Sequence, residues 1–305
     1  MAYGIDRWIF PITITSGVND TIILDEAGSD YTVTIPEGTY WAYQAAGGGF
    51  ELPGYPSLYL EISEQLTAAV GGGNAYSFLA ANPSGTSLTD NRSIILTRSA
   101  FSTNDFSLRF SQPGFTLDKR LFGVSADYAV DLANSGDETP AQGQTFGQWV
   151  SPRAASMKVS FPYRKVVLST EDTARSDLYA MRWTARRRRV FVYRHIPAAW
   201  VHQSRAEQLD YAEVVGISQN DTRMAFEHTW EALSTFQDVI VIHDQGDDSD
   251  NINNFEDVRA NHEIVRLLHS EAASDFENVL TLENMGGEFY QIEVPVIRIG
   301  GDYEQ

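Results

Sequence analysis

The side chains best suited to bind a metal ion lie in an acidic stretch near position 250. The sequence HDQGDDSDNINNFED, from position 243 to 257, contains four closely spaced aspartates: Asp244, Asp247, Asp248 and Asp250. Carboxylate oxygens are hard ligands that suit Ca²⁺. Counted from Asp248, the stretch lacks the glycine that an EF-hand loop has at its sixth position. A solvated acidic loop is the favoured interpretation, and a calcium site at these four residues is the minority alternative.

All six histidines lie between positions 195 and 269, which raises the question of a zinc or acid–base site. His262-Glu263 begins like a zinc protease motif, but Arg266 stands where the second histidine must lie on the same helical face. His262 and His269 are two helical turns apart, too far for one zinc ion without another ligand. We therefore interpret the histidines as ordinary core or surface residues and expect no catalytic residues. A metal-dependent hydrolase is the least favoured function.

Arginines are concentrated in the sequence RWTARRRRVFVYR, at Arg182, Arg186, Arg187, Arg188, Arg189 and Arg194. One interpretation is an edge strand that its charges protect from aggregation. A second is a nucleic-acid contact, with Trp183 and Tyr193 nearby for stacking. The third, which we favour, is a subunit interface in which these arginines meet carboxylates of a neighbouring copy.

The charge distribution favours this third interpretation. The formal net charge is −19, but residues 151–200 hold 11 basic and 3 acidic groups, whereas residues 201–305 hold 5 basic and 22 acidic groups. Such a reversal of sign within one chain suits a head-to-tail contact that closes into a ring. A globally acidic chain binds duplex nucleic acid poorly, because that affinity comes mainly from phosphate neutralisation. We therefore expect a homo-oligomer and no nucleic-acid partner.

The elements that must position these residues are mostly strands. Apolar residues alternate over residues 8–14, 21–24 and 31–35, and the spacing of Leu58, Ile62 and Leu66 predicts a helix over residues 57–69. The glycines at 71–73 end that helix. Further strands are predicted at 157–163, 165–170, 190–193 and 238–243, helices at 221–236 and 255–273, and a closing hairpin at 278–299.

These elements predict a strand-rich α+β protein of two domains, each with a mainly antiparallel sheet and one or two packed helices. The expected divisions are an N-terminal module at residues 1–124, a polar linker or extended arm at 125–155, and a C-terminal domain at 156–305. The absence of cysteine excludes disulfides and thiolate zinc sites. No apolar run reaches the length of about 18 residues that indicates a membrane span, and the N-terminus does not have the pattern of a signal peptide. We expect a soluble protein without a membrane partner.

The segment from Thr32 to Val124 has a recognisable order of elements. A strand ends in Gly38-Thr39-Tyr40, the amphipathic helix follows, two strands return at 94–96 and 106–110, and Leu121-Phe122-Gly123-Val124 closes the unit. This order resembles a small module of tailed-bacteriophage virion proteins. The resemblance implies a non-enzymatic structural subunit of the tail, neck or baseplate, located in the virion, whose partners are other virion proteins.

The second functional hypothesis is a receptor or glycan binder at the tail tip. Trp41, Tyr43 and Tyr55 flank the glycine-rich stretch at residues 45–56, which is expected to be an exposed loop. Such aromatic rings could act as stacking platforms for sugars, although packing in a core or an interface is their commoner role.

Overall fold

The computed structural model describes residues 5–43, 51–81, 93–99, 106–122, 130–133, 147–150, 155–160, 188–197, 201, 237–244, 262–267, 281–284 and 289–300. In this part of the chain strands dominate, α1 (Leu58–Val70) is the one α-helix, and all strand pairs are antiparallel. The strand-rich α+β class predicted from the sequence is confirmed. No helix among these residues is long and apolar enough to cross a membrane.

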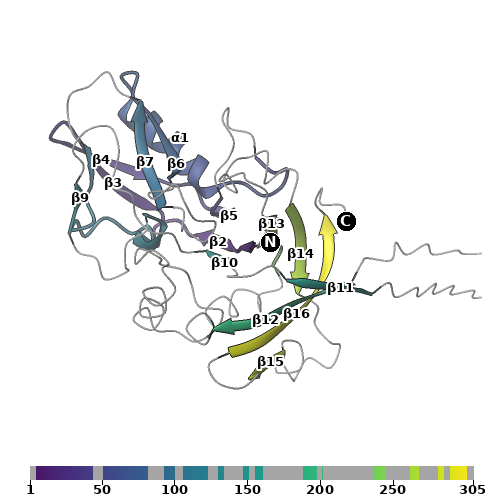
Figure 1. The fold of residues 1–305 in the computed structure, drawn as a ribbon. Helices are drawn as coiled ribbons and strands as arrows, with labels where there is room; N and C mark the ends of the chain where they lie inside the picture. The colour runs from purple at the N-terminus through teal and green to yellow at the C-terminus, as the bar shows by residue number, and fades with distance from the viewer. Residues whose placement is uncertain are drawn as a thin grey trace, which may run out of the picture.

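The strands form two groups (Figure 1). The first group, which we call the N-terminal module, surrounds α1 and contains three small sheets. In the first sheet β2 (Pro11–Ile14) pairs with β5 (Gly38–Trp41), and in the second β6 (Ala75–Ala81) pairs with β7 (Ser93–Ser99). The third sheet has the strand order β4 (Ser29–Thr34), β3 (Thr21–Glu26), β8 (Phe106–Leu108) and β9 (Leu132–Ala133). A 3-10 turn, η1 (Lys119–Phe122), closes the module.

Helix α1 forms where the amphipathic pattern predicts it. Its buried face carries apolar side chains one turn apart, at Leu58, Ile62 and Leu66. Ser57 caps the first turn, because its Oγ accepts a backbone N–H 3.3 Å away. Gly71 ends the helix with a φ of 63°, a conformation that favours glycine. The predicted helix and its glycine stop are therefore confirmed.

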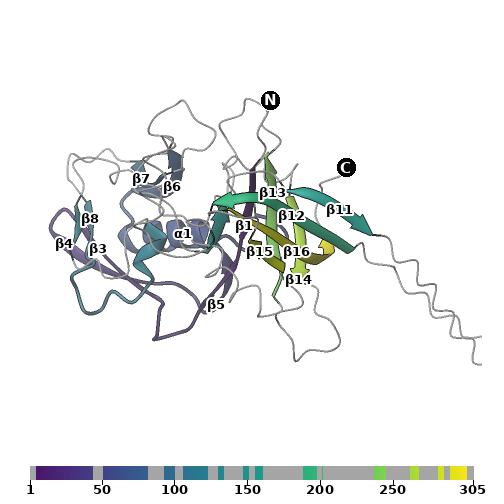
Figure 2. The ribbon, with the colours of Figure 1, turned by 60° about the horizontal axis from the view of Figure 1, so that its bottom comes forward.

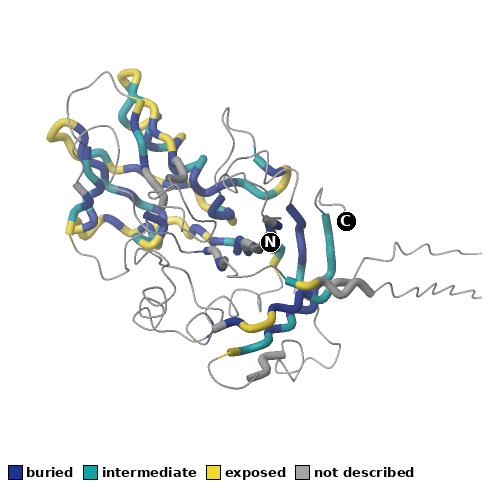
Figure 3. The backbone as a smooth tube through the Cα atoms, viewed as in Figure 1, coloured by how far each residue is buried: buried dark blue, intermediate teal, exposed yellow. Residues whose placement is uncertain are grey.

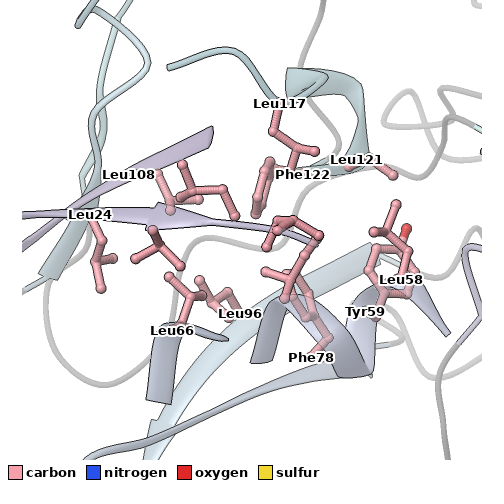
Figure 4. Packing of buried hydrophobic residues seen from close by; sticks show 14 of the residues in the cluster. Leu24, Leu58, Tyr59, Leu66, Phe78, Leu96, Leu108, Leu117, Leu121 and Phe122 are labelled. Atoms are coloured by element: carbon pink, nitrogen blue, oxygen red, sulfur yellow. The ribbon is translucent and has the colours of Figure 1, made fainter. Parts of the chain in front are cut away.

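One apolar core holds the N-terminal module together. Side chains from α1, the small sheets and η1 all contribute to it, and Figure 4 shows several of them converging: Leu24, Leu58, Leu66, Phe78, Leu96, Leu108, Leu121 and Phe122. The rings of Phe110 and Phe115 meet edge to face, with centroids 4.8 Å apart. The segments predicted as separate strands, helix and closing turn thus fold around one shared interior.

The second group is one sheet with the order β10-β1-β13-β14-β16-β12-β11, in which β15 also pairs with β16. Its strands are β1 (Ile5–Ile9), β10 (Gln148–Val150), β11 (Ser156–Ser160), β12 (Arg188–Pro197), β13 (Val239–Asp244), β14 (His262–Leu267), β15 (Thr281–Asn284) and β16 (Phe289–Gly300). The predicted closing hairpin is the β15–β16 pair, and the strands predicted near positions 190 and 240 are β12 and β13. Figure 2 shows this sheet beside the module.

The sheet is strongly curled. Trp8 in β1 donates its indole N–H to the hydroxyl of Tyr193 in β12 over 2.7 Å, although β13, β14 and β16 lie between those strands in the sheet order. The rings of Trp149 in β10 and Tyr193 also meet edge to face, 5.2 Å apart. The two ends of the sheet therefore approach each other across a concave apolar core that includes Phe191 and Val241.

The first strand does not belong to the N-terminal module, so the division at residues 1–124 needs correction. β1 pairs with β13 from Ile5↔Asp244 to Ile9↔Ile240, and β10, from the predicted linker, pairs with its other edge. The physical reason is burial on both faces: Trp8 enters the concave core, whereas Ile9 faces the module. A consecutive apolar run is typical of such an interior strand.

The module packs against the convex face of the curled sheet. Residues of both parts share one apolar cluster, which contains Ile9, Trp41, Tyr43, Leu52, Ile240, Ile242 and Ile264. The carboxylate of Asp238 joins the two parts as well, since it accepts hydrogen bonds from the hydroxyl of Tyr55 over 3.1 Å and from Arg266 Nε over 2.7 Å. The indole N–H of Trp41 donates to the Asp238 carbonyl over 3.1 Å.

The helix predicted over residues 255–273 is wrong at residues 262–267, which form strand β14. β14 pairs with β13 on one edge and β16 on the other, so its backbone groups are used in two ladders. Ile264 is buried on the convex side and Val265 on the concave side. Pairing on both edges and burial on both faces outweigh the local helical spacing. The rest of that range, and the helix predicted over residues 221–236, lie outside the described residues.

Candidate functional site

Three buried ionisable groups of the described chain lie together on the concave side of the curled sheet. Asp6 of β1 and His243 of β13 are directly opposite in the strand register, and Glu263 of β14 lies opposite Val241, two residues from His243. Their exposed fractions are only 4%, 5% and 0%. We call these three residues the Asp6–His243–Glu263 cluster. Neighbouring strands thus bring together groups that are more than 230 positions apart in sequence.

His243 is the centre of the cluster. Its Nδ1 lies 3.0 Å from Asp6 Oδ1, a hydrogen-bond distance, whereas its Nε2 lies 3.8 Å from Glu263 Oε2, within the range of an ion pair. Asp6 also accepts the backbone N–H of Ala155 through Oδ2, over 2.9 Å. Asp6 therefore fastens β1 to β13 and to the segment that leads into β11.

Aromatic side chains enclose the cluster. The ring of Phe191 stacks on His243 with centroids 5.7 Å apart and planes 13° apart, and Trp8 meets Phe191 edge to face. Burial, followed by the charge of Asp6, raises the pKa of Tyr193 well above its ordinary value, so this phenol stays neutral. These rings exclude water and strengthen the interactions among the charged groups.

The two carboxylates hold His243 in its protonated form. Burial alone lowers the pKa of the imidazole, but its interactions with Asp6 and Glu263 outweigh burial and raise the pKa from 6.5 to about 9. Asp6 is the closer partner and the stronger hydrogen-bond acceptor. At neutral pH the imidazolium of His243 therefore lies between two carboxylates. This arrangement suits an ion pair that stabilises the fold better than a general base, because a general base needs a free nitrogen lone pair.

This arrangement predicts a distinctive dependence of stability on pH. Because the folded-state pKa of His243 is higher than the unfolded value, its contribution is complete below pH 6.5 and disappears as the pH rises through about 9. We expect the free energy of unfolding to fall by about 3 kcal/mol over this interval. Urea titrations monitored by tryptophan fluorescence at a series of pH values measure the change. His243→Gln is the control and should lack this decrease; an identical pH profile in both proteins would contradict the assignment.

A second buried ionic cluster lies inside the N-terminal module. The Arg98 guanidinium, whose side chain is 0% exposed, pairs with the carboxylate of Glu26, and the hydroxyl of Tyr76 donates to the same carboxylate. Arg98 also lies over the ring of Phe106, 5.4 Å from its centroid. Burial, together with the Glu26 carboxylate, raises the pKa of Tyr76 far above its ordinary value. These groups connect β3, β6 and β7, which indicates a structural role.

The calcium hypothesis falls largely outside the described residues. Asp247, Asp248 and Asp250 are not described, and Asp244 ends β13. Among the residues that the structure describes, no group of three or more His, Asp or Glu side chains has a geometry that could hold a metal ion. Of the six histidines, His243 and His262 are buried and His195 is exposed, while the other three lie outside the described ranges.

The structure changes the interpretation of the arginine cluster. β12, which contains Arg188, Arg189 and Arg194, pairs with β11 on one side and β16 on the other, so it is not an edge strand. Tyr193 is completely buried and cannot stack on a base. Arg194 is exposed, whereas Arg182, Trp183, Arg186 and Arg187 are not described. The edge-strand interpretation is therefore wrong, the nucleic-acid interpretation lacks Tyr193 as a stacking ring, and the subunit interface stays a prediction.

The aromatic residues that the glycan hypothesis requires on the surface are packed inside the protein or partly buried. Trp41 and Tyr43 are only 7% and 2% exposed, and both pack in the cluster between the module and the sheet. Tyr55 is half-buried and meets Trp41 edge to face, 5.0 Å apart. The described end of the glycine-rich stretch is also packed, with Leu52 buried and bonded to the Tyr43 hydroxyl. Packing is therefore the role of these aromatics in the folded chain.

Sequence reasoning did not identify Asp6. Its burial could have been predicted from its position two residues before Trp8. Alternate residues of a strand lie on the same face, and a tryptophan in an apolar run is a typical core residue. A carboxylate on a buried face needs a charged or hydrogen-bonded partner. The partner, His243, could not be found in this way because its position depends on the pairing of β1 with β13.

Comparisons of the chain with family models, with curated proteins and with solved structures found no match.

Proposed function

We propose that this protein is a non-enzymatic structural subunit of a tailed phage or phage-like particle, located in the tail, neck or baseplate of the virion. It acts by binding copies of itself and other virion proteins. The observation that carries this proposal is the packing of the elements between β4 and η1. Of the residues in that span that resemble the virion module, Tyr40, Leu58, Leu96 and Leu121 contribute to one apolar core.

The chemistry of the described polar groups supports a structural role. Each of the two buried ionic clusters joins strands that are distant in sequence. Within each cluster, basic and acidic side chains pair with each other. The module and the curled sheet also share a well-packed apolar cluster. Parts joined in this way suit a structural subunit. The buried positions of Trp41 and Tyr43 give the alternative of a glycan-binding tip no support.

The proposal predicts salt-sensitive assembly. Light scattering of the purified protein in about 0.05 M salt should give the molar mass of a closed oligomer, and negative-stain images of the same peak should show rings. In about 1 M salt, where the Debye length falls to about 3 Å, we expect dissociation because the contact joins basic and acidic surfaces. A monomer of 34.0 kDa under both conditions would contradict self-assembly through charge.

A further inference from the structure

The exposed part of β12 has an unusual backbone. The register between β12 and β16 shifts between Tyr193 and Ile196, which marks a β-bulge. His195 within it has a φ of 57°, a left-handed conformation that is uncommon for residues other than glycine. In a regular strand one of two consecutive residues points to each face, but here Arg194 and His195 are both exposed. The bulge therefore leaves the side chains of Arg194 and His195 exposed at neighbouring positions on the surface.

An exposed aromatic ring lies beside them. Phe289 opens β16 opposite Pro197, and its ring meets the imidazole of His195 edge to face with centroids 6.5 Å apart. Phe289 is 40% exposed, and it is the only aromatic among the exposed large hydrophobic residues of the described chain. In Figure 3 the exposed part of β12 and the exposed start of β16 lie side by side. We call Arg194, His195 and Phe289 the bulge patch.

The composition of the bulge patch is typical of the centre of a protein interface. Arginine and aromatic residues are enriched in binding hot spots, where the ring supplies apolar area and the guanidinium pairs with carboxylates. Among the described residues Arg194 makes no hydrogen bond or ion pair, so its guanidinium is available to a partner. Residues 201–305 of the same chain carry 22 acidic and 5 basic groups.

We propose that the bulge patch is the contact through which one copy binds the acidic C-terminal third of a second copy. This inference rests on the proposed function and identifies the surface that makes its head-to-tail contact. Phe289 is the apolar anchor and Arg194 pairs with a carboxylate. The left-handed backbone of His195 lies at the bulge where Arg194 and His195 are both exposed. The observation specific to the contact is the bulge, at which Arg194 and His195 are both exposed and the ring of His195 meets Phe289.

The test compares surface substitutions that leave the core intact. Arg194→Glu and Phe289→Ser should each raise the dissociation constant of the oligomer by about tenfold or more in low salt, as hot-spot changes do. Arg120→Glu, which makes the same charge reversal, and Val18→Ser, which makes a similar apolar-to-polar change, are the controls. Both positions are exposed in the N-terminal module, so these variants should assemble like the wild type. His195→Gly should fold normally, since glycine adopts a positive φ readily, but should also bind more weakly.

A photo-crosslinking phenylalanine analogue at position 289 identifies the partner segment. Mixed with an isotope-labelled copy, it should capture peptides from residues 201–305 of the labelled chain. If Arg194→Glu and Phe289→Ser form the same salt-sensitive rings as the wild type, or if the crosslinks fall outside residues 201–305, this inference is wrong and the proposed subunit function stands. If the wild type is monomeric at every salt concentration, the self-assembly in the proposed function is wrong, and the inference that rests on it is wrong as well. Binding of a single-stranded oligonucleotide that Arg194→Glu abolishes would assign the patch to nucleic acid and overturn the inference.

Discussion

Replacing Asp6 with alanine is expected to lower the free energy of unfolding by about 3 to 5 kcal/mol, because it leaves the His243 imidazolium buried without its nearest carboxylate. It also removes the acceptor of the Ala155 N–H. A domain is typically stable by about 5 to 15 kcal/mol, so this loss should be conspicuous. Urea denaturation monitored by tryptophan fluorescence measures it, since Trp8 and Trp149 line the same core.

The matched control is Asp118→Ala, which breaks the exposed pair with Arg120 and should cost about 1 kcal/mol or less. A double-mutant cycle with His243→Ala isolates the interaction between Asp6 and His243. A coupling energy close to zero would show that the cluster does not fasten β1 to the sheet. A large coupling at pH 7 that vanishes above the pKa of His243 would confirm that the interaction is ionic.

Replacing Glu26 with glutamine is expected to cost about 3 to 5 kcal/mol in the stability of the N-terminal module, since it removes the charge that faces the buried guanidinium of Arg98. The change keeps the size of the side chain, so altered packing contributes little. Thermal unfolding followed by circular dichroism measures the effect. Asp25→Asn, at the adjacent position of β3, is the matched control because its partner Arg109 is partly exposed.

A second variant separates the cost of an unpaired charge from the value of the pair. Because replacing both members of a buried ion pair by uncharged residues is often neutral, Glu26→Gln combined with Arg98→Met should regain most of the stability lost in Glu26→Gln. If the double variant is instead less stable than Glu26→Gln alone, then Arg98 contributes mainly through its contact with Phe106 and other groups rather than through Glu26.

Much of the local structure was predictable because it depends on neighbouring residues. The period of Leu58, Ile62 and Leu66, the cap at Ser57 and the stop at Gly71 together specify α1. Alternation in β3 and β4, and the pattern of the closing pair β15 and β16, likewise predict strands from short-range information. These features formed where the sequence indicated.

The errors arose where long-range pairing decides the outcome. Residues 262–267 have helical spacing, yet they form β14 because two neighbouring strands supply hydrogen bonds on both edges. β1 appeared to open the N-terminal module, yet it pairs with β13, over 230 positions away. No local pattern encodes which strand accepts such a partner, since every strand offers the same backbone groups.

Composition and local periodicity were sufficient to predict the strand-rich class, the helix α1, the absence of thiol chemistry and the reversal of charge at about residue 200. Tertiary pairing brings Asp6 to His243, buries Trp41 and Tyr43 between two parts, and places the ring of His195, at a bulge, beside Phe289. The physical reason is that composition and periodicity act within a segment, whereas clusters of charge and exposed patches depend on strand order and register, which are properties of the whole fold.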